Sequence, residues 1–400
     1  MLLHLIVMLL LLAASLAAAQ EAGERARRLH RDALVFDAHI HVINRQFHHG
    51  GDIGDRLRGG QFDLPRAREG GVDAMFFSLF VPEQYYPARH ETRHTLRLLD
   101  LALRQIEKNR DTIALALNAG DVERITREGK IAAVLDLEGG FDLDGDLGVL
   151  RVLHRLGFRS LQLAAHNWTN EFADSCCAPK KWNGLNQRGR AVVGEMNRLG
   201  MVINVSHASD ETLEQAIDAS SDPLVATHHG LRALNDIPRT MPGRLLKKLA
   251  AKGGVIAFHS GNSFHNRRFF DWQTKHAGRP FWDTSAVSRT GRLSIEAIDR
   301  QVAPRFPMVG LPAPDEVIMS VDDWVAVVER AIAVAGEDHV ALGSDFDGGP
   351  TLPRGMRDVR DLPMITAAML RRGWPEERVR KFLGGNLLRV FRRITEKKNE

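Results

Sequence analysis

The 400-residue sequence has few cysteines and no concentration of positive charge. Its two cysteines are adjacent, at Cys176 and Cys177, and neighbouring cysteines rarely form a structural disulfide because the geometry is strained. We therefore expect no disulfide scaffold, although a metal-thiolate role for the pair stays open. The net charge is +4, with no long basic run and no aromatic residues interleaved with basic ones. We accordingly expect no nucleic-acid partner.

Two motifs that mark large enzyme classes are also missing. The sequence has no G-x-S-x-G segment, which would place a nucleophilic serine on a strand-to-helix turn. No glycine-rich loop opens a helix after the first predicted strand, where such a loop would bind phosphate groups. These absences argue against a serine hydrolase of that type and against a nucleotide-binding enzyme.

The long apolar run of the chain lies at its start. Leu2–Ala19 is interrupted only by His4 and Ser15, and ends in three alanines before Gln20. This pattern predicts a signal peptide over residues 1–19 and therefore export to the periplasm or the cell exterior. The segment before the apolar run has no Lys or Arg, so a retained membrane anchor is the alternative. We expect membrane association only if the segment is not cleaved.

After this segment, short apolar runs alternate with helical patterns, which predicts parallel strands joined by helices. Eight such units predict an α/β fold, the (β/α)8 or TIM barrel, as a single domain over residues 25–396. The segment 259–320 breaks the alternation, and we expect it to form loops and short helices over the mouth of the barrel. The predicted strands are Leu34–His41, Val72–Val81, Lys130–Glu138, Ser160–His166, Met201–His207, Leu224–His228, Gly254–His259 and His339–Asp345. The predicted helices include Thr92–Asn109, Leu147–Leu156, Gly189–Leu199, Glu211–Ala219, Gly243–Ala251, Asp322–Ala335 and Glu376–Ile394.

Histidines and carboxylates stand where these strands are predicted to end, at the face of a barrel where catalytic residues collect. His39 and His41 are two apart on one strand, so both imidazoles can face the same side. Zinc favours imidazole and carboxylate ligands, and a carboxylate can bridge two cations about 3.5–4 Å apart. The pattern predicts a site for two Zn²⁺ ions, with Glu138 as the bridge. The predicted metal ligands are His39, His41, Glu138, His207 and His228.

Asp345 directly follows the last apolar run, in the segment Gly343–Gly348. It is a candidate for moving a proton from an attacking water to a leaving amine. The alternatives are that Asp345 is a metal ligand or that Asp347 does this work. His229 is expected to point away from the site and to be packed. Five other histidines are expected on the surface: His48, His49, His90, His94 and His265.

Several segments, taken together and in order, resemble the membrane (renal) dipeptidase family. The likeness covers most of the chain after residue 20. The matching segments are Phe62–Pro65, Glu69–Val72, Leu137–Gly140, His166–Asn170, Met196–Met201, Val205–His207, Gly343–Gly348 and Gly384–Phe391.

The resemblance implies a (β/α)8 barrel that holds two zinc ions and hydrolyses dipeptides by a metal-bridged hydroxide, including dipeptides with a D-residue on the C-terminal side. His39 would hold one zinc, Glu138 would bridge both, and His207 and His228 would hold the second. His166 would contact the substrate or the developing oxyanion, and Asp345 would transfer the proton. Arg239 would hold the substrate carboxylate; the residue pattern by itself could not separate Arg239 from Arg232. The family is often dimeric, which implies a homodimer.

The sequence departs from the family at two positions. The family usually has H-x-D where this chain has His39-Ile40-His41. We expect the first metal site to be less negative for this reason, which would weaken it or change its metal preference. Asn204 stands where an Asp is common, and we expect altered support for His207.

Three functions stay open from the sequence. The first is the dipeptidase. The second keeps the site but acts on N-acyl amino acids, lactones or β-lactams, and the third is a binding protein that lost activity through the change at His41.

Overall fold

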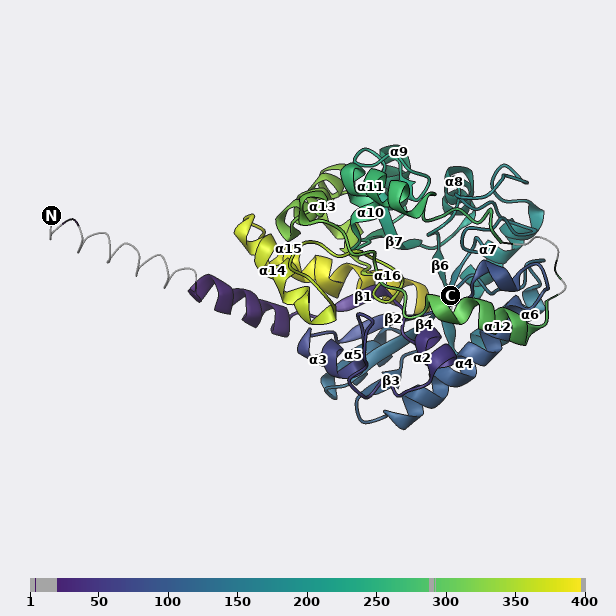
Figure 1. Ribbon diagram of the computed structural model, residues 1–400, viewed down its shortest axis with the longest axis horizontal. Helices are drawn as coiled ribbons and strands as arrows, with labels where there is room; N and C mark the ends of the chain where they lie inside the picture. The colour runs from purple at the N-terminus through teal and green to yellow at the C-terminus, as the bar shows by residue number, and fades with distance from the viewer. Residues whose placement is uncertain (1–3, 5–19, 288–290, 292, 397–400) are drawn as a thin grey trace.

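A parallel sheet that closes on itself forms the centre of the molecule, as predicted (Figure 1). Within the part of the chain that the structure describes, eight main strands follow the order β1-β2-β4-β5-β6-β7-β9-β10. Each predicted run overlaps one of the eight strands, but β5 begins two residues before its predicted run and β7 ends three residues after it, while most other runs continue beyond the observed ends. The strands are β1 (Phe36–Ile40), β2 (Ala74–Phe80), β4 (Ile131–Glu138), β5 (Phe158–Gln162), β6 (Val202–Asn204), β7 (Val225–Leu231), β9 (Val255–Phe258) and β10 (Val340–Leu342).

The computed structural model describes residue 4 and residues 20–287, 291 and 293–396. The predicted signal peptide over 1–19 therefore lies outside the described residues, except for position 4. None of the helices in the described ranges combines the length and the apolar character needed to cross a membrane.

The barrel closes between its first strand and the residues that follow its last strand. The amide of His41 donates to the carbonyl of Phe346 at 2.9 Å, and the amide of Asp345 donates to the carbonyl of His39 at 2.9 Å. Ile40 and Phe346 form a parallel bridge at the same place. This closure brings Asp345 beside His39 and His41, although more than 300 residues separate them in sequence.

Small and branched side chains fill the barrel interior and are covered at one end by the last helix. Phe36 and Phe76 lie in one cluster with Phe391, at ring-centroid distances of 6.2 and 6.0 Å from it. α16 (Asn386–Thr395) buries residues at helical spacing, among them Leu387, Val390 and Phe391. An apolar stripe of this period covers a core. The helix therefore closes the amino end of the barrel, opposite the polar carboxyl end.

The helices that surround the sheet lie close to their predicted positions. α9 (Gly243–Ala251) has the predicted bounds, and α13 (Val321–Ala335) starts at a capping box of Ser320 and Asp323. The predicted last helix is divided into α15 (Glu376–Arg380), a π turn η6 (Lys381–Gly385) and α16. The other predicted helices are α4 (Glu91–Lys108), α6 (Leu147–Arg155), α7 (Gln187–Leu199) and α8 (Asp210–Ala219), while α2 (Ile43–His49), α3 (Leu64–Glu69), α5 (Ala119–Arg127) and α14 (Leu362–Arg371) were not singled out.

Two short strands lie off the main path. β3 (Ile113–Leu115) pairs with the first half of β4, and β8 (Thr240–Met241) pairs with the end of β7. β8 directly follows Arg239, so its pairing with Gly230 and Leu231 fixes that arginine near the carboxyl end of the barrel.

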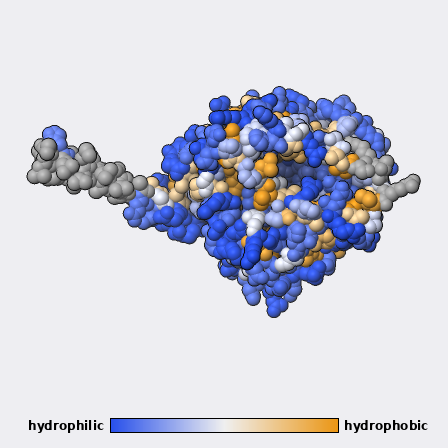
Figure 2. All heavy atoms as spheres, in the orientation of Figure 1, coloured by the Kyte–Doolittle hydropathy of each residue, from blue (hydrophilic) through white to orange (hydrophobic). Residues whose placement is uncertain are grey.

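The covering segment, residues 259–320, contains short helices as predicted: α10 (Asn262–His265), α11 (Arg267–Ala277) and α12 (Ile295–Val302). It contributes Phe264, Phe281, Arg305 and Met308 to the cavity described below. The surface around it is mostly hydrophilic, with small groups of apolar side chains (Figure 2).

Candidate metal centre and active site

Glu138 lies at the centre of four histidines at the carboxyl end of the barrel. Its Oε2 lies 3.2 Å from Nε2 of His39 and 3.0 Å from Nε2 of His41. Its Oε1 lies 3.0 Å from Nε2 of His207 and 3.5 Å from Nε2 of His228. The structure thus brings together the five predicted metal ligands, with two imidazoles on each carboxylate oxygen.

Local backbone conformation explains why Glu138 can approach the histidines. Glu138 ends β4 and is followed by Gly139 at φ +68° and Gly140 at φ +71°. A Cβ at Gly139 would lie 2.2 Å from the hydroxyl oxygen of Tyr86, so only glycine fits beside that ring. His166 and His207 also have positive φ, at +54° and +63°. Such strain in non-glycine residues collects at functional sites.

The opposite ring nitrogens of three of these histidines are held by other side chains. Nδ1 of His39 lies 2.9 Å from Oγ of Ser78 and 3.3 Å from Oδ2 of Asp136. Nδ1 of His207 lies 3.0 Å from Oδ1 of Asn167, and Nδ1 of His228 lies 3.1 Å from Oγ1 of Thr227. Metal-binding histidines are oriented in this way, because a partner on one nitrogen fixes the other toward the ion.

The donor atoms lie close enough together to coordinate metal ions. Three groups of side chains each present ligand atoms within 4.8 Å of one another: His39, His41 and Asp345; His39, Glu138 and His228; and Glu138, His166 and His207. Glu138 is anionic: burial opposes its ionisation, but the charge of His39 and hydrogen bonds from His207 and His39 hold its pKa well below the ordinary value. Imidazole nitrogens with a shared carboxylate are the ligands that zinc prefers.

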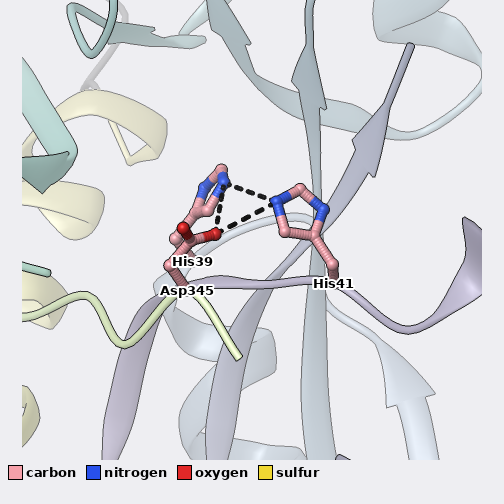
Figure 3. A group of neighbouring side chains, drawn as sticks. All are labelled: His39, His41 and Asp345. Carbon is pink, nitrogen blue, oxygen red and sulfur yellow. Dashed lines mark hydrogen bonds and ion pairs between the residues drawn. The ribbon is translucent and has the colours of Figure 1, made fainter. Parts of the chain in front are cut away.

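Asp345 lies between His41 and His259. Its Oδ1 is 3.3 Å from Nε2 of His41 and 3.9 Å from Nε2 of His39, so the three side chains converge (Figure 3). Its Oδ2 accepts a hydrogen bond of 2.9 Å from Nε2 of His259. Burial opposes ionisation of this carboxyl, but hydrogen bonds from His259 and His41 hold its pKa below the ordinary value. Asp345 is therefore an anion within the cluster.

Asp347, the alternative to Asp345, lies apart from this cluster. Its Oδ1 accepts a hydrogen bond from the backbone amide of Gln61. Burial raises the pKa of Asp347 to about 7, and this hydrogen bond only partly opposes the effect of burial. It is not among the side chains that line the cavity. The geometry therefore favours Asp345.

His166 faces the same centre from the loop after β5. Its Nδ1 contacts Oε1 of Glu83, and its Nε2 lies 3.8 Å from Oε1 of Glu138. Its ring packs 4.0 Å from that of His207, centroid to centroid. His166 therefore directs one nitrogen into the cluster and has the other held by a carboxylate.

Arg239 is 1% exposed, and its three guanidinium nitrogens have no hydrogen-bond partner among the described residues. Burial lowers its pKa to about 10, with Glu138 and Asp345 acting against that shift, so the side chain is charged at neutral pH. Arg232, the alternative, is paired with Asp210 and donates to the carbonyl of Thr240. Of these two arginines, Arg239 is thus the one whose guanidinium nitrogens all lack a hydrogen-bond partner among the described residues, whereas only Nε of Arg232 does.

These groups line one cavity of about 190 Å³. Phe80, Phe264, Phe281 and Met308 contribute apolar surface beside the polar groups. Small-molecule sites range over roughly 300–1,000 Å³, so this cavity suits a small ligand.

Some expectations from the sequence were wrong. His94 and His265 are buried instead of exposed. Cys176 and Cys177 are joined by a disulfide. Asn204, expected to affect the support of His207, instead accepts a hydrogen bond from the amide of Ser206 through Oδ1. The side chain that contacts Nδ1 of His207 is Asn167. His229 is buried with Nδ1 on the carbonyl of Gly230, as expected.

Three members of the site were not selected from the sequence: Glu83, Asn167 and His259. His259 stands at the end of a predicted strand, and the positional rule that selected His228 applied to it as well. Glu83 follows β2 in the turn η1 (Glu83–Tyr85), and a single loop carboxylate carries no comparable signal.

A parallel barrel with buried histidines and carboxylates at the carboxyl ends of its strands defines a metal-dependent hydrolase. The model of the membrane dipeptidase family, peptidase family M19, matches residues 23–400. The chain belongs to this family.

Named relatives agree with this membership. The dipeptidase tcpJ of Claviceps purpurea (strain 20.1) is 32% identical over 345 residues, which cover 84% of this chain and 70% of the relative. The crystal structure of the probable dipeptidase PvdM from Pseudomonas aeruginosa has a TM-score of 0.77 at 24% identity, and covers 94% of this chain and 99% of its own. A Rhodobacter sphaeroides metallopeptidase, liganded with a phosphinate mimic of the dipeptide L-Ala-D-Ala, has a TM-score of 0.70 at 24% identity, and covers 90% of this chain and 99% of its own. These two structures share the fold.

Proposed function

We propose that the protein is a zinc-dependent dipeptidase that uses two zinc ions and accepts dipeptides with a D-residue on the C-terminal side. One observation carries the proposal: Arg239 is buried, its guanidinium nitrogens have no hydrogen-bond partner among the described residues, and it lines the same small cavity as the cluster around Glu138. A buried charge without a partner is costly. A substrate carboxylate would supply the missing partner, and a guanidinium binds a carboxylate through two hydrogen bonds.

Each carboxylate oxygen of Glu138 lies beside two histidines, and we assign each pair of histidines to one ion. His39 and His41 would hold the first ion, His207 and His228 the second, and Glu138 would bridge both. When bound, a zinc pair supplies an activated water near neutral pH and polarises a carbonyl. The histidine partners Ser78, Asn167 and Thr227 keep the ligating nitrogens directed inward.

The remaining polar groups would bind the substrate and move the proton. Arg239 would hold the carboxylate of the C-terminal residue. His166 would donate from Nε2 to the oxygen of the scissile carbonyl as negative charge develops there. Asp345 would carry the proton to the leaving amine. Since the cavity is small, a longer peptide would have no room beyond the residue that Arg239 binds.

Substrate pairs that differ in one group test this proposal. We expect hydrolysis of L-Ala-L-Ala and L-Ala-D-Ala, and a loss of at least tenfold in kcat/KM for the C-terminal amides of both. An N-acyl amino acid without a free amino group serves as the comparison, because it tests the alternative amidohydrolase function. Zinc content per chain should be close to two. Faster hydrolysis of N-acyl amino acids, or no bound metal in active protein, would overturn the proposal.

The expected N-terminal signal peptide is part of the same proposal. Cleavage after residue 19 and export would place the enzyme in the periplasm or outside the cell. The mass of the protein recovered from the exported fraction tests this. Recovery of the full-length chain in the membrane fraction alone would contradict it.

A further inference from the structure

His259 is a buried histidine of the cavity that the proposed reaction does not use. It directly follows β9 (Val255–Phe258) and is 4% exposed. Its Nε2 lies 2.9 Å from Oδ2 of Asp345. We propose that His259 is a positioning residue that holds Asp345 as a ligand of the first cation in the enzyme without substrate, and that the same carboxylate takes up the proton of the attacking water during the reaction. This inference rests on the proposed function for the presence of that cation.

The surroundings of His259 fix which of its nitrogens carries the proton. The amide of Gly261 donates to Nδ1 of His259 at 2.7 Å. Nδ1 is therefore an acceptor, and the proton lies on Nε2, which donates to Asp345. The imidazole is a neutral donor in a single tautomer.

The ring and backbone of His259 are also held in place. The ring of Phe264 stacks on the imidazole at 3.9 Å with an interplanar angle of 15°. The carbonyl of His259 accepts hydrogen bonds from Nε1 of Trp324 at 3.0 Å and from Nε2 of His265 at 2.6 Å. The donor that faces Asp345 therefore has little freedom to move.

With Oδ2 held by His259, the other oxygen of Asp345 faces the first pair of histidines. Oδ1, Nε2 of His39 and Nε2 of His41 form a triangle with edges of 3.0, 3.3 and 3.9 Å (Figure 3). Zinc–nitrogen and zinc–oxygen bonds of roughly 2.0–2.2 Å in a tetrahedron separate ligand atoms by roughly 3.3 Å. Oε2 of Glu138, 3.2 and 3.0 Å from the two histidines, supplies the fourth corner. The five distances that involve the two histidines, 3.0–3.9 Å, lie near the spacing of one tetrahedral site.

The charge of the ligands explains why Asp345 would coordinate the first ion in this chain. The family pattern H-x-D gives the first ion one carboxylate from the first strand, and His41 replaces it here with a neutral imidazole. Coordination by Asp345 returns one negative charge, so the divalent ion faces two carboxylates, those of Glu138 and Asp345. His259 fixes the direction of the Asp345 carboxylate through its hydrogen bond to Oδ2. The ligand set thus compensates for the change at position 41.

Metal binding, measured on the full-length chain without a substrate, separates this inference from the proposed activity. Apo protein is titrated with Zn²⁺ by calorimetry and with Co²⁺ by absorption spectroscopy. We expect His259→Leu to weaken one of two binding steps by about 10–100-fold, the usual effect of losing a group that orients a ligand. Asp345→Asn should weaken the same step, and the Co²⁺ spectrum of that step should change.

His259→Gln should recover much of the affinity, because its side-chain amide can donate to Asp345.

His94→Phe is the matched control, since it removes a buried histidine that does not line the cavity and should leave both steps unchanged. Thermal melting confirms that each variant is folded. If His259→Leu is not folded, His259→Phe, which keeps an aromatic ring against Phe264 but has no donor, takes its place. Two unchanged steps in folded Asp345→Asn, or in both His259 variants, would overturn the inference while the dipeptidase stands. A wild-type chain that binds no metal would instead overturn the proposed function.

Discussion

Glu83 accepts a hydrogen bond from Nδ1 of His166, and the same carboxylate oxygen accepts the amide of Asn167 at 3.3 Å. Glu83 is buried in the turn η1, where Tyr85 donates to Asp299 of α12 at 2.6 Å. Burial opposes ionisation of Glu83, but the charge of His166 and its hydrogen bond hold the pKa below the ordinary value. One turn thus connects the covering segment to the histidine proposed to contact the oxyanion.

Glu83→Gln keeps the shape of this contact and removes its charge. We expect kcat for L-Ala-L-Ala to fall about 10–100-fold, because the imidazole loses the carboxylate that orients it. Zinc content should stay at the wild-type value, since Glu83 contacts His166 and Asn167 but none of the five proposed zinc ligands. Gln84→Ala, in the same turn, is the control and should leave kcat unchanged. Loss of zinc from Glu83→Gln would mean that His166 is itself a ligand.

Arg239→Met should change binding and stability in opposite directions. The substrate loses a charged hydrogen-bond partner, worth about 1.5–3 kcal/mol, so KM for a dipeptide should rise about 10–150-fold. The free protein loses a buried charge that makes a cation-π contact with Phe264 but no hydrogen bond among the described residues, so its melting temperature should rise. Arg232→Met is the comparison, because it breaks the pair with Asp210 and should not raise KM. A fall in melting temperature for Arg239→Met would contradict our view of that side chain.

The sequence predicted the positions around which the site is built because parallel strands bring their carboxyl ends to one face. That rule placed His39, Glu138 and His228 together without any knowledge of the loops. It could not predict that Asp345 lies between His41 and His259, because this depends on the closure of β1 against the residues after β10.

Two errors have simple physical origins. His94 was assigned to the surface as a polar residue, yet it lies on the apolar stripe of α4 with Leu98 and Ala102, where helical spacing places it inside. Strand ends were set too late, since predicted strands continued to His166 and His207. Both residues have positive φ, which a strand cannot continue through, and a sequence pattern does not reveal this.

His41→Asp restores the family pattern and tests the charge argument at the first site. We expect the variant to keep both zinc ions at chelator concentrations that remove one from the wild type, because a third carboxylate increases the attraction for a divalent ion. Zinc retained after dialysis against a series of chelator concentrations measures this. His41→Asn, neutral and similar in size to Asp, is the control for side-chain length. Weaker zinc retention in His41→Asp than in His41→Asn would show that charge does not limit this site.

Stability should fall in mild acid because of His94. Its ring is buried against Tyr85 at 3.9 Å, and neither nitrogen has a hydrogen-bond partner within the described ranges. Burial, followed by the charge of Arg97, lowers the pKa of His94 to about 3 from 6.5. Between these pH values the unfolded chain binds a proton that the folded protein excludes, so the free energy of unfolding decreases as pH falls below 6.5.

His94→Phe removes this proton and keeps an aromatic ring in the same place. At pH 5, which is 1.5 units below the pKa of the unfolded chain, wild type should have lost about 2 kcal/mol through His94. We measure the free energy of unfolding of both proteins in urea. The difference, variant minus wild type, should be up to about 2 kcal/mol larger at pH 5 than at pH 8. His276→Phe, on the exposed side of α11, should show no such difference. Equal stability differences at both pH values would mean that His94 accepts a proton in the folded protein as easily as in the unfolded chain.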